Sequence, residues 1–154
     1  IAVTPVQLAQ AYGVFASYGL KRPVSILKQE KVPEAERVMP EHLAKQVVAM
    51  LETVTQKGGT GTRARVPLYR VAGKTGTVHK PSKDGGYEDD VYAAGFAGMA
   101  PASNPRLLCV VIIDNPKGEQ YYGGEVAAPV FSRIMTESLR LLNVAPDNLL
   151  PSQG

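Results

Sequence analysis

Three consecutive stretches of sequence decide the fold: YRVAGKTGTV at residues 69–78, VYAAGFAGMA at residues 91–100 and RLLCVVIID at residues 106–114. Each has the length of a strand and is rich in β-branched or small residues, and polar segments containing Gly, Pro, Asn and Asp separate them. The links at residues 79–90 and 101–105 fit hairpins rather than parallel crossovers, which need a dozen or more residues and usually a helix. The sequence therefore predicts three consecutive antiparallel strands.

Helical patterns precede these strands. We expect the first helix over Pro5 to Ser17, with Thr4 as its N-cap and Gly19 just past its end. A second helix is expected from about Pro40, with one apolar stripe formed by Leu43, Val47, Met50, Leu51 and Val54. Residues 21–39 between the two helices predict a loop with one short strand around Val24-Ser25-Ile26-Leu27.

A final helix is expected after the strands, following Gly123-Gly124 and with Pro129 in its first turn. Its broad apolar face should lie on the sheet and consists of Val130, Phe131, Ile134, Met135, Leu139 and Leu142. The tail at residues 145–154 has few anchors, and we expect it to fray. Helices packed on the faces of an antiparallel sheet make the predicted fold class α+β.

Length and composition restrict the class of protein. The 154 residues suffice for one domain that buries about 68–70% of the surface of its unfolded chain. A hydrophobic content of 44% with 20% charged residues excludes a disordered chain. The longest aliphatic run, Leu107 to Ile113, is far shorter than the roughly 20 residues of a transmembrane helix. Because the chain begins at Ile1 inside an apolar stretch without a signal-peptide pattern, we expect it to be a piece of a longer protein.

The charge distribution is uneven although the formal net charge is only +3. Seven basic residues and no acidic residue occur between Lys57 and Lys83, which fits either an anionic partner or a solvated basic face. A charge this small does not indicate nucleic acid binding. His42, His79 and Cys109 are too far apart in sequence for a metal-ligand spacing, so we expect no structural zinc.

Residues 71–78, VAGKTGTV, carry the strongest chemical signal. The tripeptide Gly-Lys-Thr suggests a phosphate loop, but that motif requires a glycine five positions before Gly73, where this sequence has Leu68. A purely structural interpretation makes Gly73 and Gly76 a bulge or a close approach of two backbones. It leaves Lys74 and the two threonines unexplained.

A third interpretation is a ledge that binds a carboxylate and a carbonyl at the edge of a cleft. Strand alternation places Thr75 and Thr77 on the same side, where two hydroxyls can hold one carboxylate. Gly76 leaves room for a substrate backbone, and an exposed strand edge can pair with an extended peptide. Lys74 points nominally to the other face, so strand twist and its long stem must bring its ammonium group round to an anionic substrate.

Lys-Thr-Gly is also the third sequence element of penicillin-binding proteins and class A β-lactamases, and its context here is more specific. Residues 1–10 lead into a helix, AGFAG at 94–98 precedes Ala100-Pro101, and YYGG at 121–124 leads into AAPVF at 127–131. In this order, and over nearly the whole chain, these motifs resemble the C-terminal part of the transpeptidase domain of a class B penicillin-binding protein. The nearest resemblance is to the septal penicillin-binding protein 3 group of Gram-negative bacteria.

The chain departs from that family in its serine motifs. The family carries its nucleophile in Ser-x-x-Lys and a second motif in Ser-x-Asn, both well upstream of Lys-Thr-Gly. The sequence has no Ser-x-Asn, and Ser82-Lys83-Asp84 follows the Lys-Thr-Gly motif. Ser25 to Lys28 matches Ser-x-x-Lys in letters, but it lies in a strand-like stretch after Pro23 and not at the start of a buried helix. We therefore expect residues 1–154 to be the C-terminal portion of one transpeptidase domain, without its nucleophile.

The resemblance implies a D,D-transpeptidase that cross-links peptidoglycan stem peptides in septal cell-wall synthesis, is acylated by β-lactams and needs no cofactor or metal. Lys74 would be the electrostatic and proton-shuttle partner of the missing Ser-x-Asn serine. Thr75 and Thr77 would hold the carboxylate of the substrate or of a β-lactam, beside Gly76. The backbone N–H of Thr77 would be one oxyanion-hole donor.

The resemblance also implies secondary contacts and partners. Tyr121 and Tyr122 form either an aromatic wall of the cleft or an ordinary pair of core or surface tyrosines, and His79 is a candidate contact for the acyl side of the substrate. Expected partners are stem peptides, β-lactams, the upstream part of the same domain and membrane proteins of the division machinery, but no nucleic acid. The expected location is the periplasmic face of the inner membrane.

Two other functions remain open at this point. A serine β-lactamase or D,D-carboxypeptidase would share the same ledge, and a non-catalytic module would use the basic segment to capture an anionic polymer. In the family the complete sheet has five strands, of which this chain would supply three. The isolated chain would then expose an apolar sheet edge, so we expect it to be stable only with the rest of its domain.

Overall fold

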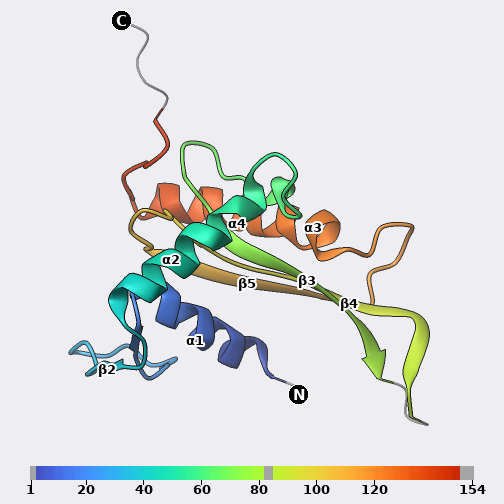
Figure 1. The fold of residues 1–154 in the computed structure, drawn as a ribbon, viewed down its shortest axis with the longest axis horizontal. Helices are drawn as coiled ribbons and strands as arrows, with labels where there is room; N and C mark the ends of the chain where they lie inside the picture. The colour runs from blue at the N-terminus through green and yellow to red at the C-terminus, as the bar shows by residue number, and fades with distance from the viewer. Residues whose placement is uncertain (1–2, 82–84, 150–154) are drawn as a thin grey trace, which may run out of the picture.

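The computed structural model describes residues 3–81 and 85–149, except for the side chains at positions 81 and 87–90. Its centre is an antiparallel sheet in the order β3-β4-β5, formed by β3 (Ala72–Pro81), β4 (Tyr87–Ala100) and β5 (Leu107–Asp114) (Figure 1). The three predicted strands and the α+β class are confirmed. The boundaries differ, because Tyr69 to Val71 precede β3 and both arms of the β3-β4 hairpin extend into the predicted link. Backbone pairing continues there without an apolar pattern to indicate it.

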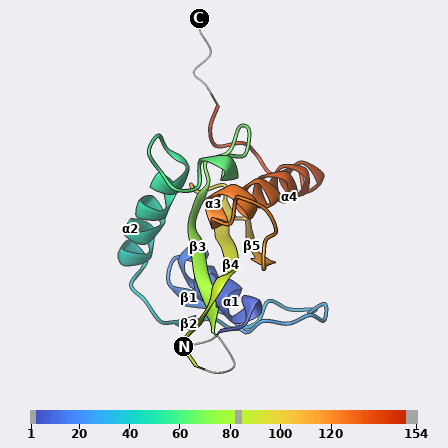
Figure 2. The same cartoon turned by 90° about the vertical axis from the view of Figure 1, so that its right-hand side faces the viewer.

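Helices cover both faces of the sheet, with α1 on one side and α3 and α4 on the other, while α2 runs beside β3 (Figures 1 and 2). Two very short strands, β1 and β2, pair with each other below α2. The bounds are α1 (Pro5–Ala16), β1 (Leu20–Lys21), β2 (Glu36–Arg37), α2 (Glu41–Glu52), η1 (Thr53–Thr55), η2 (Thr62–Ala64), α3 (Gly123–Val126) and α4 (Ala128–Leu141).

The sheet separates two apolar cores. The larger one lies between the sheet and α4, where the rings of Phe96 and Phe131 are 4.8 Å apart. The smaller one joins Met99 of β4 to α1 and α2. Gly73 and Gly98 face each other across β3 and β4, and a Cβ at either position would come within 2.8 Å of the Phe96 ring. These two glycines therefore give Phe96 the space in which its ring packs.

The start of α1 follows the prediction closely. The Thr4 hydroxyl accepts a hydrogen bond from the Gln7 backbone N–H, and the Gln7 side chain accepts one from the Thr4 backbone N–H. This capping box satisfies two backbone donors that the first turn of a helix leaves unpaired.

The strand predicted around Val24 to Leu27 is wrong. Ile26 is 99% exposed, and within the described residues these positions pair with no other strand. The pairing in this region is instead between β1 and β2, which flank the loop. Apolar residues alone do not form a strand when no neighbouring strand supplies hydrogen-bond partners.

The predicted apolar stripe of α2 is confirmed only in part, because Val54 is buried in the larger core and Leu51 packs against the smaller one. Leu43 and Met50 are largely exposed, whereas the buried residues of α2 are Ala44 and Val48. The helix turns its smaller side chains toward α1 and β3. Small residues allow the elements to approach closely, and this contact outweighs the larger apolar side chains on the neighbouring face.

The apolar face of α4 is narrower than predicted. Phe131, Met135 and Leu139 are buried against the sheet, but Ile134 and Leu142 are 45% and 61% exposed. The buried residues follow a spacing of four, so the sheet covers a single row of side chains along the helix. Beside this row, Val130 packs partly buried against the larger core, whereas Ile134 and Leu142 stay exposed.

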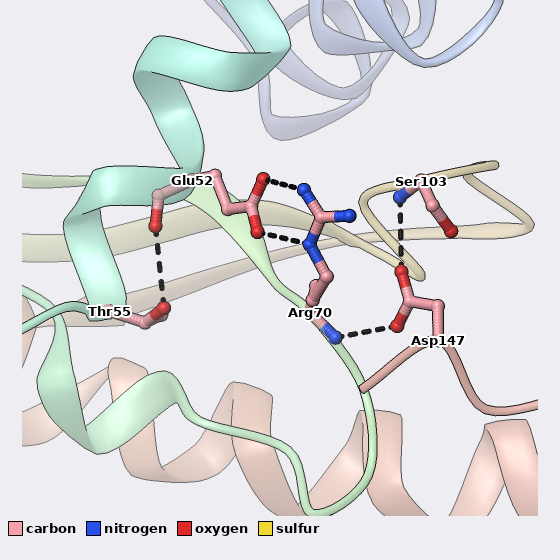
Figure 3. Close-up of polar contacts among 5 residues, drawn as sticks. All are labelled: Glu52, Thr55, Arg70, Ser103 and Asp147. Carbon is pink, nitrogen blue, oxygen red and sulfur yellow. Dashed lines mark hydrogen bonds and ion pairs between the residues drawn. The ribbon is translucent and has the colours of Figure 1, made fainter. Parts of the chain in front are cut away.

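Part of the C-terminal tail is anchored, contrary to expectation. The Asp147 carboxylate accepts hydrogen bonds from the backbone N–H groups of Arg70 (2.7 Å) and Ser103 (3.1 Å) (Figure 3). The Asn148 backbone N–H donates to the Leu68 carbonyl at 3.0 Å. Residues 150–154, where the prediction of fraying also applied, lie outside the described residues. None of the described helices is both long and apolar enough to cross a lipid bilayer.

Candidate substrate-binding site

Strand β3 carries the Lys-Thr-Gly-Thr motif along the edge of the described sheet. Among the described strands its one neighbour is β4, with Lys74 opposite Ala97 and Thr77 opposite Ala94. The backbone groups on its other edge are therefore not used by the described strands. Such an edge can pair with an extended peptide.

Thr75 and Thr77 point to the same side of β3, as alternation predicts. Together with Thr60, Tyr122 and Glu125 they line a polar cavity of about 350 Å³. The Thr75 hydroxyl lies 2.8 Å from the Thr60 hydroxyl. The Thr77 hydroxyl accepts a hydrogen bond of 3.0 Å from the Gly123 backbone N–H. Two hydroxyls thus border one cavity, an arrangement that can hold a carboxylate.

Lys74 is on the other face of the strand, where it lines an apolar cavity of about 460 Å³ between α1 and the sheet. Its stem bends back toward the edge, so that Nζ donates to the Thr75 carbonyl at 2.9 Å and lies 3.4 Å from the Thr75 hydroxyl. The ammonium group thereby lies beside Thr75, at the edge of the strand. Gly76 is exposed beside it, and a Cβ at this position would meet no atom within 4 Å.

The first turn of α3 sits directly against the motif. A Cβ on Gly123 would lie 2.2 Å from the Gly95 carbonyl oxygen and 2.5 Å from the Gly76 carbonyl oxygen. A Cβ on Gly124 would lie 2.0 Å from the Thr60 carbonyl oxygen. Backbone contacts this short exclude any side chain at either position, so the two glycines allow α3 to border the polar cavity.

Aromatic rings continue the site beyond the motif. The Tyr92 ring stacks on Tyr121 at 4.2 Å, and Tyr121 contacts Tyr122 at 4.5 Å. The His79 ring also packs against Tyr92, with the ring centroids 4.4 Å apart. Tyr122 is 54% exposed and lines the polar cavity, whereas Tyr121 is partly buried in the row. This arrangement favours the aromatic-wall interpretation of the two tyrosines.

The basic segment from Lys57 to Lys83 contacts the protein itself at several points. Arg65 Nε donates to the Thr55 carbonyl at 2.7 Å, and Arg63 reaches the Glu125 carbonyl at 3.4 Å. Arg70 and Lys80 form ion pairs with carboxylates. These basic side chains therefore have partners within the protein, so the charge cluster does not require an anionic polymer to explain it.

The serine that matches Ser-x-x-Lys is not placed like a nucleophile. Ser25 is exposed in a bend, and its hydroxyl donates to the Leu27 carbonyl at 2.9 Å. No described helix begins there. The near match to Ser-x-Asn at residues 82–84 lies outside the described residues.

Three residues of the site, Thr60, Tyr92 and Glu125, were not singled out from the sequence. Thr60 lies in the Gly58-Gly59-Thr60-Gly61 loop, and only the fold brings it to Thr75. Tyr92 lies in β4 opposite His79, where strand pairing alone could not indicate that it stacks on Tyr121. The glycines around Thr60 are the one local signal, because they predict a loop that can approach another backbone closely.

Comparison with known proteins gives a consistent result. The family profile described as "Penicillin binding protein transpeptidase domain" matches residues 1–136. The chain is 48% identical over 149 residues to the peptidoglycan D,D-transpeptidase FtsI of Escherichia coli K12, which covers 97% of this chain and 25% of that protein. It is 47% identical over 152 residues to the probable peptidoglycan D,D-transpeptidase PbpC of Pseudomonas aeruginosa, covering 99% of this chain and 27% of that protein.

A solved structure shares the fold. The apo structure of the TP domain from Burkholderia pseudomallei penicillin-binding protein 3 has a TM-score of 0.86 and 43% identity, covering 94% of this chain and 44% of that chain. The chain spans about a quarter of the length of the curated relatives it matches. With this sequence match, fold and motif order, the chain belongs to the penicillin-binding protein transpeptidase domain family, similar to FtsI and penicillin-binding protein 3.

Proposed function

We propose that this chain is the C-terminal portion of a peptidoglycan D,D-transpeptidase domain and forms its carboxylate-binding side. The observation that carries the proposal is the pair of hydroxyls on Thr75 and Thr77, which border one cavity at a strand edge that the Lys74 ammonium group also reaches. A serine outside this chain attacks the D-Ala-D-Ala carbonyl, releases D-alanine and passes the acyl group to an amine of a neighbouring strand. A β-lactam acylates the same serine.

The motif residues divide the tasks of this reaction among them. Thr75 and Thr77 bind the terminal carboxylate, and Gly76 leaves the strand edge open for the substrate backbone. The Thr77 N–H is one of two oxyanion-hole donors. Lys74 places a positive charge beside the carboxylate and exchanges a proton with the serine of the upstream Ser-x-Asn motif. Tyr122, with Tyr121 behind it, forms one wall of the cleft.

The upstream part of the domain is the natural occupant of the apolar cavity between α1 and the sheet. Val78 and Ile112 line this cavity and remain 61% and 44% exposed in this chain. The chain covers 44% of the matching transpeptidase-domain structure, so more than half of such a domain is available to bury them. Stem peptides, β-lactams and membrane proteins of the division machinery are the proposed partners, at the periplasmic face of the inner membrane.

Intact mass spectrometry of the complete protein, before and after incubation with a penicillin, tests the proposal. We expect one penicillin mass on a peptide upstream of Ile1, formed slowly and retained. Lys74→Ala should lower the acylation rate by about 10²–10⁴, the range for losing a positioned proton-transfer group. Lys45→Ala is the matched control, because Lys45 is an exposed lysine paired with Glu41 on α2 and should leave the rate unchanged.

The other functions give different results in the same experiment. Rapid loss of the adduct with release of hydrolysed penicillin indicates a β-lactamase or carboxypeptidase. No adduct at all, with anionic polymer still bound after Lys74→Ala and Thr75→Ala, indicates a binding module. An adduct on Ser25 contradicts the assignment of the nucleophile to the upstream part.

A further inference from the structure

The hydrogen bonds around the two threonines differ in how well their direction is determined. A threonine hydroxyl has one proton to donate and two lone pairs that accept. The partner of Thr77 is a backbone N–H, which can only donate, so the Thr77 proton is left for another acceptor. The partner of Thr75 is the hydroxyl of Thr60, at 2.8 Å, and either oxygen can be the donor.

A bound carboxylate selects one of these two directions. Carboxylate oxygens only accept, so Thr75 must turn its proton toward the ligand. Lys74 Nζ, 3.4 Å from the Thr75 hydroxyl, also has only protons to offer. Thr75 then accepts from its protein neighbours, and Thr60 is the neighbour whose proton lies at full hydrogen-bond distance.

Thr60 is held in place by the backbone around it. The Gly61 N–H donates to the Val54 carbonyl at 3.0 Å, and a Cβ on Gly61 would lie 2.8 Å from the Phe96 ring. On the other side, Gly124 packs against the Thr60 carbonyl. The loop is therefore fixed between the larger core and α3, which keeps the Thr60 hydroxyl beside Thr75 without a ligand.

We propose that Thr60 is a positioning residue for carboxylate recognition: it donates to the Thr75 hydroxyl and thereby directs the Thr75 proton into the polar cavity. Thr60 acts through Thr75, and the Gly123 N–H performs the same task for Thr77. Both hydroxyls are then oriented as donors before the ligand arrives, which lowers the cost of ordering them on binding. This inference rests on the proposed function.

Acylation kinetics of the complete protein test the inference. Thr60→Val keeps the shape of the side chain but removes the hydroxyl, and Thr60→Ser keeps the hydroxyl. We expect Thr60→Val to lower the second-order rate constant of acylation by benzylpenicillin about 5- to 30-fold. The variant loses the hydrogen bond from Thr60 to the Thr75 hydroxyl, which itself donates to the charged carboxylate. Thr60→Ser should remain within about twofold of the wild-type rate.

A ligand without the carboxylate separates positioning from a general structural role. Thr60→Val should not change acylation by benzylpenicillin methyl ester, nor the melting temperature of the protein without ligand. An equal loss with acid and ester, no loss with either, or failure of Thr60→Ser to restore the rate each overturns the role of Thr60. If the wild-type protein is not acylated by either compound, the proposed function itself fails, and that result is seen without any variant.

Discussion

The guanidinium group of Arg70 binds the carboxylate of Glu52 through two hydrogen bonds, Nε to Oε1 at 2.5 Å and Nη2 to Oε2 at 2.7 Å (Figure 3). Glu52 is the last residue of α2, and Arg70 lies two residues before β3. This ion pair raises the pKa of Arg70 above its usual range. Because the Arg70 backbone N–H also donates to Asp147, one residue joins α2, the C-terminal segment and the entry to the motif strand.

Glu52→Gln should lower the free energy of unfolding by about 1 kcal/mol. The ion pair is bidentate and the Glu52 side chain is only 18% exposed, whereas solvent around Arg70 weakens the pair. Glu137→Gln is the control, because its pair with Arg140 is exposed on both sides and should change stability by less than about 0.5 kcal/mol. Urea unfolding of the complete domain measures both. Equal effects would show that the link between α2 and β3 adds nothing beyond a surface ion pair.

Gly123→Ala should disrupt the site as well as the fold. The new Cβ would meet two backbone carbonyl oxygens, of Gly95 and Gly76, neither of which can rotate away. We expect a loss of about 3 kcal/mol or more and at least about a tenfold slower acylation, because β3 or α3 must move. Urea unfolding and penicillin labelling of the complete protein measure these two losses.

Gly13→Ala is the matched glycine control for this experiment. Gly13 lies within α1, and a Cβ there meets nothing within 4 Å. It should stabilise the domain by about 0.5–1 kcal/mol through its better helix propensity. Normal acylation by the Gly123→Ala protein would contradict the close packing of α3 on the motif strand.

Phe131→Ala and Ile134→Ala test which face of α4 is buried. Phe131 is fully buried against Phe96, so its truncation should cost about 3–5 kcal/mol. Ile134, nearly one turn further along the helix, is 45% exposed and should cost less than about 1 kcal/mol. Thermal or urea unfolding of the complete domain compares the two. A comparable loss at Ile134 would mean that another part of the domain covers this flank of α4.

The thiol of Cys109 should react slowly with alkylating reagents in the native protein. It is half-buried beside the larger core, and burial raises its pKa above the ordinary value of 9.0. Less thiolate is then present at pH 8 than in the unfolded chain, so iodoacetamide should modify Cys109 several-fold more slowly in the native protein.

The raised pKa of Cys109 also makes the stability of the fold depend on pH. A group whose pKa is raised by folding contributes its full stabilisation below its unfolded pKa and loses it as the pH rises through the native value. The contribution of Cys109 is therefore constant below about pH 8 and declines above pH 9. Peptide mass mapping across pH 7–10, with a urea-unfolded sample as reference, follows the thiol. Equal alkylation rates in the two samples at pH 8 would exclude this burial effect.

Features set by neighbours in the sequence were predictable. The capping box needs only Thr4 and Gln7, three residues apart, and the common side of Thr75 and Thr77 follows from strand alternation. The three strands and their antiparallel hairpins follow from short polar links between apolar runs. The order of the motifs along the chain was enough to indicate the family, because it does not depend on how the elements pack.

Features that join distant segments came only from the tertiary structure. Whether α2 buries Leu43 or Ala44 depends on which surface faces it, and an apolar pattern shows only that some surface does. Thr60 meets Thr75, and Asp147 meets Arg70, because the folded chain brings together segments that lie 15 and 77 residues apart in the sequence. Local periodicity carries no information about such contacts. The sequence therefore determined the elements and the motif strand, while packing decided which residues surround that strand and orient its hydroxyls.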